Sequence, residues 1–244
     1  MAVSRDTAVL MLHGFTAQPK TVNFIESYFQ REGYEYEIPV LRGHATKRED
    51  LIGVKWQDWV DDAMAAYSRL EKLKGKVAVI GHSMGAIAAV QVALQKPDIR
   101  ALVLVAPAFK FANPVAGLAQ YLQVFMKFQP GDGSSVLDPA LREESDRLQV
   151  TYKGFPTAAF VELFNMAKLT IPKLENVKVP TLVIHSLKDQ VIPPAAAELA
   201  LEKLGSSDKS LKWFQNSGHE MFWDMEREAL CEAIVGFLNQ KTRI

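Results

Sequence analysis

The 244-residue sequence lacks most of the features that mark secreted, membrane-spanning or nucleic-acid-binding proteins. Its one cysteine, Cys231, has no partner for an internal disulfide, and we expect it to be a buried apolar residue of a helix. The 28 basic residues balance 28 acidic ones, so no surplus of positive charge favours binding to nucleic acid. No apolar run approaches the roughly 20 residues that cross a bilayer, and the N-terminus lacks the pattern of a secretory signal. We therefore expect a cytoplasmic protein with no membrane span and no nucleic-acid partner.

Histidine is also scarce. The chain has five histidines, and none stands in an H-E-x-x-H or similar spacing of metal ligands, so no metal site is predicted. The remaining composition is ordinary for a globular protein, with 48% hydrophobic and 23% charged residues. A chain of this length suits one large domain that buries about 70% of its unfolded surface.

Short apolar runs alternate with helical patterns along the chain. Runs that are apolar on both faces are typical of parallel strands covered by helices. We expect such strands at residues 7–12, 76–80, 101–105 and 181–184, with weaker candidates at 34–39 and 210–214. Apolar residues spaced three and four apart predict helices at residues 19–30, 56–73, 84–95, 193–204 and 224–239. The alternation indicates the α/β class, with a doubly wound, mostly parallel sheet of about six strands.

One long region interrupts this alternation. Between residues 108 and 179 no convincing strand is present, and helical patterns occur at residues 114–128, 139–148 and 156–167. About 70 residues are too many for a connecting loop. We therefore expect residues 1–107 and 176–244 to form the core and residues 108–175 to form a mainly helical cap. The cap should lie over the carboxyl edge of the sheet, where ligands of such folds bind.

The segment Gly81-His82-Ser83-Met84-Gly85 joins a predicted strand to a predicted helix. A G-x-S-x-G sequence occurs often by chance, but this strand-before and helix-after context is the one that a nucleophilic serine requires. The turn is tight, so side chains at the two glycine positions would collide. We interpret Ser83 as a nucleophile raised above the sheet edge; the alternative is a glycine-rich turn with an incidental serine.

A serine hydroxyl needs a base to take its proton and an acid to orient that base. Asp189 follows the predicted strand at 181–184, and His219 lies between the last strand and the last helix. Both therefore belong to loops at the same sheet edge as Ser83, in the chain order serine, acid, histidine. The alternatives are a turn or helix-capping role for Asp189 and a surface position for His219. Glu220 and Asp224 are close to the histidine in sequence and poorly placed to orient it.

Acyl transfer also needs two N–H donors that hold the oxyanion of the tetrahedral intermediate. One is expected from Met84, the residue after the nucleophile. The second is expected from Phe15, in the loop after the first strand, where Gly14 allows close approach of the backbone. We expect His13 to hold this loop through hydrogen bonds of its ring.

Several segments together resemble the α/β-hydrolase superfamily, and most of all its small bacterial carboxylesterases and monoacylglycerol lipases. The matching segments are His13-Gly14-Phe15-Thr16, Arg42-Gly43-His44, Trp56-x-x-Trp59-x-x-Asp62, Gly81-x-Ser83-Met84-Gly85, residues 189–193 and Gly218-His219. The resemblance covers nearly the whole chain except the cap. It implies an ester hydrolase with a Ser–His–Asp triad and with neither a metal nor another cofactor. The glycine usual after the histidine of the second segment is Ala45 here.

The cap is rich in aromatic residues. Most of them are expected to form the cap's own core, but some must face the sheet edge and make an apolar pocket over Ser83. We name Phe109, Phe125, Phe160 and Phe164 as candidate substrate-binding residues. Such a pocket suits a small apolar ester and does not suit a phosphorylated or highly charged substrate.

The sequence thus predicts a serine esterase that hydrolyses short- to medium-chain carboxylic esters through an acyl-enzyme, with monoacylglycerols among the candidate substrates. The same triad could also serve a C–C bond hydrolase or a perhydrolase, and the fold alone does not choose among them. A third hypothesis, from another class, is a small-molecule receptor in which a ligand closes the cap onto a partner. The sequence leaves open whether the protein is a monomer or a homodimer.

Overall fold

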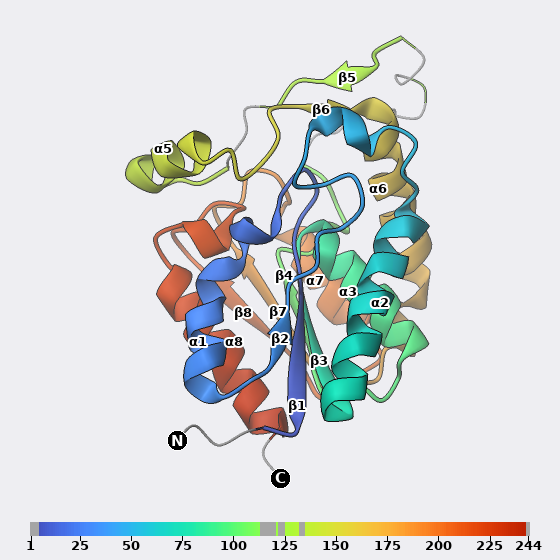
Figure 1. The fold of residues 1–244 in the computed structure, drawn as a ribbon, viewed down its shortest axis with the longest axis vertical. Coiled ribbons are helices and arrows are strands. Elements are labelled where there is room, and N and C mark those ends of the chain that lie inside the picture. Colours follow the sequence, from blue (N-terminus) through green and yellow to red (C-terminus); the bar gives the residue numbers. More distant parts are fainter. Residues whose placement is uncertain (1–4, 113–120, 122–124, 132–134, 243–244) are drawn as a thin grey trace.

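A six-stranded parallel sheet forms the centre of the molecule in the computed structural model, which describes residues 5–112, 121, 125–131 and 135–242 (Figure 1). The strand order is β2-β1-β3-β4-β7-β8. The strands are β1 (Thr7–Leu12), β2 (Tyr36–Glu37), β3 (Lys76–His82), β4 (Leu102–Val105), β7 (Thr181–Ser186) and β8 (Lys209–Phe214). All neighbouring pairs run parallel, so all carboxyl ends meet at one edge. This confirms the predicted fold class and number of strands.

Helices cover both faces of the sheet, as the doubly wound prediction requires. On one face lie α1 (Glu26–Glu32) and α8 (Arg227–Thr242), and on the other lie α2 (Trp56–Lys74), α3 (Met84–Gln95) and α7 (Ala195–Lys203). Alternate residues of each strand point to opposite faces: Val9 and Met11 pack with α1 and α8, whereas Leu10 and Leu12 pack with α2 and α3. The result is two apolar cores, one on each side of the sheet.

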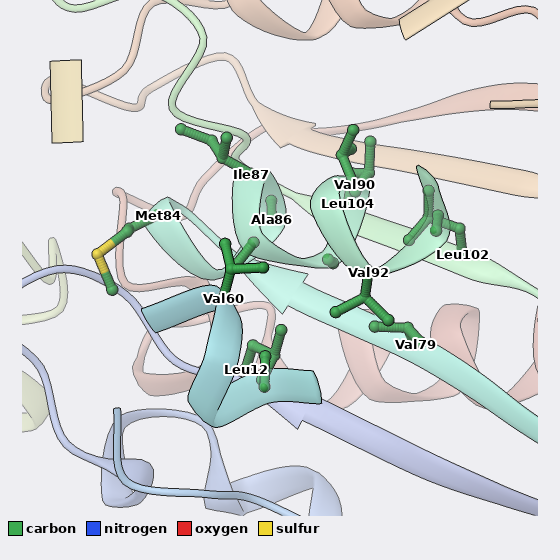
Figure 2. Packing of buried hydrophobic residues seen from close by; sticks show 14 of the residues in the cluster. Leu12, Val60, Val79, Met84, Ala86, Ile87, Val90, Val92, Leu102 and Leu104 are labelled. Carbon is green, nitrogen blue, oxygen red and sulfur yellow. The ribbon is translucent and has the colours of Figure 1, made fainter. Parts of the chain in front are cut away.

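Helix α3 occupies the centre of one core. Ala86, Ala88 and Ala89 are fully buried, and these small side chains let the helix approach the sheet closely. Figure 2 shows side chains of α3 gathered with those of β1, β3 and β4 and with Val60 of α2. This packing fixes the position of the first turn of α3, which follows Ser83 directly.

The observed ends of several elements differ from the expected ones for local reasons. The predicted helix at 19–30 begins as two 3-10 turns, Pro19–Thr21 and Asn23–Ile25, and becomes α-helical only from Glu26. Strand β2 has only two residues, because it is an edge strand and Pro39 follows, which has no N–H for pairing. Helix α8 starts three residues later than predicted, after Asp224 has turned its carboxylate to other partners.

The segment between β4 and β7, called the cap segment below (residues 108–175), contains helices and one small ladder. Helix α5 (Pro139–Arg147) and helix α6 (Thr157–Thr170) have nearly the same bounds as the helices predicted at 139–148 and 156–167. The pattern at 114–128 falls largely outside the described residues, and its last residue, Phe128, belongs to a strand instead. That strand, β5 (Phe128–Gln129), pairs antiparallel with β6 (Phe155–Pro156). The absence of strands that we expected here is therefore corrected: two-residue strands are too short to leave a periodic signal.

The cap segment stands over the carboxyl edge of the sheet, at the end of the molecule opposite the two chain termini (Figure 1). Helix α6 departs from the expected arrangement, because its buried residues Ala159, Leu163 and Met166 join the core beside α2 and α3. The Gln91 side chain of α3 also donates a hydrogen bond to Thr170 Oγ1 at 2.6 Å. Helix α6 is thus part of the helical layer as well as of the cap segment. Within the described ranges, no helix is long and apolar enough to cross a membrane.

Candidate active site

Ser83 lies in a strained turn between β3 and α3. Its φ of 55° and ψ of −116° place a non-glycine residue in a sparsely populated conformation, which the surrounding core enforces. A Cβ at Gly81 would lie 2.1 Å from the Gly85 carbonyl oxygen, and one at Gly85 would lie 2.3 Å from that of Leu12. Both glycines of the motif are therefore required by close backbone packing, as the sequence predicted.

The structure brings the three predicted residues Ser83, His219 and Asp189 into one hydrogen-bonded array. His219 Nε2 lies 2.9 Å from Ser83 Oγ, and His219 Nδ1 lies 2.7 Å from Asp189 Oδ2. Because a carboxylate only accepts, Nδ1 carries the proton and Nε2 is free to accept the serine proton. The other oxygen of Asp189 accepts from the N–H groups of Val191 and Ile192, at 2.8 and 2.9 Å, which hold the carboxylate in place.

Burial and charge act in opposite directions within this array. Burial alone would lower the pKa of His219, but the charge and hydrogen bond of Asp189 outweigh burial and raise the pKa above its ordinary value. Burial alone would raise the pKa of Asp189, but the charge and hydrogen bond of His219 and the N–H of Ile192 outweigh burial and lower it. The favoured state is an ionised Asp189 beside an imidazole that binds a proton readily, which is the electrostatic arrangement a general base needs.

The two N–H groups predicted to hold an oxyanion, those of Phe15 and Met84, are both available. In the part of the chain that the structure describes, neither donates a hydrogen bond to another backbone or side-chain group. Met84 is the first residue of α3, where the N–H has no partner within the helix and the helix dipole is positive. A Cβ at Gly14 would lie 3.3 Å from Ser83 Cβ, so the loop that carries Phe15 passes directly beside the serine.

The ring of His13 holds this loop, as expected from the sequence. Its Nδ1–H donates to the Gly14 carbonyl at 2.9 Å, and its Nε2 accepts the Leu41 N–H at 3.2 Å. Burial lowers the pKa of His13 to about 3, so the ring stays neutral and keeps both bonds. The His44 ring packs edge-on against His13 and makes its own bonds to carbonyls of its loop, which fits the expected loop-holding role.

The segment Trp56-x-x-Trp59-x-x-Asp62 supports the same loops from α2. Trp59 donates its indole N–H to the Arg42 carbonyl at 3.0 Å, and Asp62 accepts the Arg42 N–H at 2.7 Å. The Arg42 guanidinium also pairs with the Asp62 carboxylate at 2.9 Å. The sequence contained this segment as a family signature, but its role as the support of the Arg42–His44 loop becomes clear only in three dimensions.

His82 makes a contact that the sequence did not predict. Its Nε2–H donates to the backbone carbonyl of His219 at 2.9 Å, so the residue before the nucleophile is tied to the residue that would act as base. Burial lowers the pKa of His82 to about 3. The other nitrogen, Nδ1, has no hydrogen-bond partner among the described residues and faces Glu220 Oε2 at 3.9 Å. Burial raises the pKa of Glu220.

Four aromatic residues of the cap segment form a cluster with Phe15 that extends along α6. The Phe15 ring contacts Phe155 and Phe160 at centroid distances of 5.4 and 6.4 Å. Phe111 continues the cluster by contacting both Phe160 and Phe164 at 5.2 and 6.1 Å. All five rings are half-buried, so the cluster presents an apolar surface beside the candidate oxyanion donors.

The predicted substrate-binding residues therefore divide into three groups. Phe160 and Phe164 belong to the aromatic cluster beside the site. Phe109 is buried in the core under the cap segment and is 4% exposed. Phe125 is 90% exposed and has no ring partner in the described part of the chain, so our expectation that it lines a pocket is corrected. Periodicity and composition do not distinguish an aromatic residue that faces inward from one that faces solvent in an irregular segment.

A cavity of about 430 Å³ lies between the loop that carries Phe15 and the cap segment. Its walls combine residues 16–18, 45–49, 146 and 148–153. The Tyr152 N–H donates to the Thr16 carbonyl at 2.9 Å, and the Tyr152 hydroxyl donates to the Gly43 carbonyl at 3.1 Å. The cap segment is thus joined to both loops near the serine. Within the described ranges, no group of three or more His, Cys, Asp and Glu side chains is arranged to hold a metal ion.

A parallel α/β sheet, a serine in a strained strand–helix turn and a histidine and aspartate on later loops define the class of the α/β-hydrolases. The chain belongs to the family described as serine aminopeptidase, S33, whose model matches residues 4–227. It is 27% identical to the thermostable monoacylglycerol lipase of Bacillus sp. (strain H-257), over 94% of this chain and 89% of that protein. It is 25% identical to the carboxylesterase of Bacillus subtilis (strain 168), over 96% of this chain and 93% of that protein.

Solved structures agree with these relatives. The structure reported for LipS and LipT, two metagenome-derived lipolytic enzymes, matches with a TM-score of 0.90 and 28% identity, over 98% of this chain and 96% of that one. A monoglyceride lipase from Saccharomyces cerevisiae matches with a TM-score of 0.85 at 19% identity, which shows the shared fold alone. The protein is therefore an α/β-hydrolase of the carboxylesterase and monoacylglycerol lipase type, as the resemblance in sequence predicted.

Proposed function

We propose that this protein is a serine esterase that hydrolyses short- to medium-chain carboxylic esters through an acyl-enzyme intermediate. The observation that carries the proposal is the hydrogen-bonded array of Ser83, His219 and Asp189, placed beside two unused N–H donors at the carboxyl edge of the sheet. The proposal is supported by three features that acyl transfer needs: a serine in contact with a candidate base, a carboxylate that orients this base and two N–H groups as candidates to hold the oxyanion.

The proposed reaction begins when Ser83 Oγ attacks the ester carbonyl carbon and His219 Nε2 takes the hydroxyl proton. The negative charge that develops on the carbonyl oxygen is held by the N–H groups of Phe15 and Met84. Asp189 stabilises the imidazolium through the Nδ1–H bond and remains ionised. When the C–O bond breaks, the leaving alcohol takes the proton from Nε2. A water molecule then repeats the sequence on the acyl-enzyme and releases the acid.

The aromatic cluster is evidence that the acyl group of the substrate is apolar. Phe155 and Phe160 contact the ring of Phe15, whose N–H is one of the candidate oxyanion donors, and each methylene buried against these rings would contribute about 0.8 kcal/mol. The names of the two bacterial relatives support carboxylic esters and include monoacylglycerols among the substrates to be tested. No structural observation favours the C–C bond hydrolase, the perhydrolase or the receptor hypothesis.

The deciding experiment is a panel of p-nitrophenyl and glycerol esters from C2 to C16, measured as kcat/KM. We expect sustained turnover with an optimum between about C4 and C10, because a pocket of limited size gains affinity per methylene only until it is full. A diketone and an amino-acid p-nitroanilide serve as controls for C–C cleavage and aminopeptidase activity. A single turnover that leaves the acyl group bound would favour the receptor hypothesis, and turnover of either control alone would overturn the esterase proposal.

A further inference from the structure

The buried carboxylate of Asp224 connects the loop of His219 to the cap segment. Its Oδ2 accepts the N–H of Gly218, the residue before His219, and the N–H of Leu137 in the cap segment, both at 2.7 Å. Its Oδ1 accepts the N–H of Asp138 at 3.1 Å and that of Met225 at 2.9 Å. Asp224 is completely buried. One side chain therefore satisfies donors from two segments that are more than 80 residues apart in sequence.

The two segments are also in direct backbone contact. A Cβ at Gly218 would lie 2.2 Å from the Ser135 carbonyl oxygen and 3.1 Å from Leu137 Cγ. No side chain fits at position 218 while residues 135–138 stay in place, because moving a backbone carbonyl costs more free energy than moving the end of a flexible side chain. The position of the His219 loop therefore depends on the position of residues 135–138, and the position of residues 135–138 depends on that of the loop.

This arrangement is more than the capping of α8. The first N–H groups of a helix are the usual partners of a nearby carboxylate, yet only Met225 among the four donors lies near the start of α8. Charge-assisted bonds from carboxylates to backbone N–H groups are about twice as strong as neutral ones. Asp224 directs three of them to the catalytic-histidine loop and the cap segment.

Glu226 provides a natural comparison on the same loop. Its carboxylate accepts the N–H groups of Gln215, Asn216 and Ser217, at 3.2, 2.8 and 2.9 Å, together with the Ser217 hydroxyl. It makes no hydrogen bond to the cap segment within the described residues. Each carboxylate accepts four hydrogen bonds. All four of Glu226 come from residues 215–217, whereas Asp224 accepts one from Gly218 and two from the cap segment, so of the two it is Asp224 that joins the loop to the cap segment.

We propose that Asp224 is a positioning residue that couples the seating of residues 135–138 to the alignment of His219 with Ser83. The inference rests on the proposed function, because it assigns His219 the role of base. Asp224 touches neither the substrate nor the reacting atoms. It acts through the Gly218–His219 peptide, whose displacement by about 1 Å is enough to lower turnover on the order of 100-fold.

The test compares Asp224→Asn with its matched control, Glu226→Gln. An asparagine keeps the size of the side chain but turns an NH2 group toward N–H donors, so two of the four bonds are lost. In Asp224→Asn we expect kcat to fall at least about tenfold with KM nearly unchanged, since the lost alignment matters in the transition state. In Glu226→Gln we expect the thermal midpoint to fall while kcat per folded molecule stays close to that of the wild type.

Two readouts do not depend on turnover. Hydrogen exchange should accelerate in Asp224→Asn at whichever of the Leu137 and Asp138 amides faces the new NH2 group, and should stay unchanged at both amides in Glu226→Gln. The NMR resonance of the His219 Nδ1 proton, which lies between His219 and Asp189, should broaden or shift only in Asp224→Asn. If Asp224→Asn does not fold, Gly218→Ala gives the same test, because the added methyl displaces the cap backbone and leaves the carboxylate intact. We expect Gly218→Ala to show the same loss of kcat and the same faster exchange.

Equal effects of the Asp224 and Glu226 substitutions on kcat would overturn the proposal, and so would loosened amides in the cap segment with unchanged kcat. Ser83→Ala, measured alongside, separates this inference from the proposed function. If Ser83→Ala keeps its turnover, the esterase mechanism is wrong and the positioning role falls with it. If Ser83→Ala is inactive and Asp224→Asn is fully active, only the positioning role is wrong.

Discussion

His82 donates its Nε2–H to the backbone carbonyl of His219, so the turn that carries the serine also holds the loop that carries the candidate base. The two rings lie 5.1 Å apart between centroids, and Phe222 packs edge-on against His82. The distance between Ser83 Oγ and His219 Nε2 is therefore controlled by a bond within one small buried unit. This contact gives a histidine at the residue before the serine a structural role, because its ring N–H ties the turn to the loop of His219.

Replacing His82 with phenylalanine should keep the ring volume and remove the donor. The His219 carbonyl then loses a buried partner, which costs about 1 kcal/mol or more in stability, and the loop becomes free to shift. We expect a lower thermal midpoint and a decrease in kcat with little change in KM. Steady-state kinetics and thermal unfolding check both parts. Unchanged kcat would mean that the rest of the loop holds His219 without this bond.

Ser83→Ala should remove nearly all turnover, on the order of a 10⁶-fold loss, and leave the fold intact. His219→Ala should be comparably inactive. The double variant should be no slower than either single variant, because the serine and histidine act as one unit. Active-site titration with a fluorophosphonate, which should label the wild type only, checks the nucleophile independently. A double variant much slower than both single ones would contradict the shared role.

Asp189→Asn tests the acid and the pH dependence together. Asp189 raises the pKa of His219, and catalysis needs the neutral imidazole, so the acid limb of the wild-type kcat/KM profile should lie above pH 6.5. Without the carboxylate the histidine is easier to deprotonate, and the limb should move to lower pH. The rate itself should fall by orders of magnitude, because asparagine favours the wrong tautomer of His219. An acid limb that stays in place would assign the titration to another group, such as Glu220, whose charge also acts on His219.

Acid should destabilise the fold through three buried histidines. Burial lowers the pKa of His13 and His82 to about 3 and that of His44 to about 4, whereas in the unfolded chain all three titrate near 6.5. Below pH 6.5 the unfolded state binds more protons, so stability falls with decreasing pH, by up to about 1.4 kcal/mol per unit for each histidine. His219 and Glu220, whose pKa values are raised, oppose this in part. Urea unfolding at pH 7 and pH 5 measures the slope; a free energy of unfolding that is equal at both would contradict it.

The aromatic cluster can be tested against the exposed phenylalanine. Phe160→Ala should lower kcat/KM more for C8 than for C2 p-nitrophenyl esters, because long acyl chains lose more apolar contact. Phe125→Ala should leave the whole chain-length profile unchanged, since that side chain is 90% exposed. The ratio of C8 to C2 activity is the measurement. A loss of chain-length preference in Phe125→Ala would show that this residue covers bound substrate.

Much of the site could be predicted from the sequence because its signals are local. The turn of residues 81–85 needs glycines at 81 and 85 because a strand leads directly into a helix there. The loops that follow parallel strands must meet at one edge of the sheet. Those two facts, together with the chain order serine, acid, histidine of the resembling family, led to the predictions for Ser83, Asp189 and His219 and for the N–H groups of Phe15 and Met84. The alternation of apolar runs likewise determines the parallel sheet, because a strand covered on both faces must be apolar throughout.

The contacts that join these loops to one another become visible only in the folded structure. The bond from His82 to His219 spans 137 residues, and those from Asp224 reach back 86 and 87 residues into a segment without a periodic pattern. Which aromatic residues of that segment face the site and which face solvent is likewise visible only in the folded structure. Hydrophobic periodicity records only which side of a local element is buried. Partners in irregular loops depend on how separate parts of the chain pack, and no single stretch of sequence carries that information.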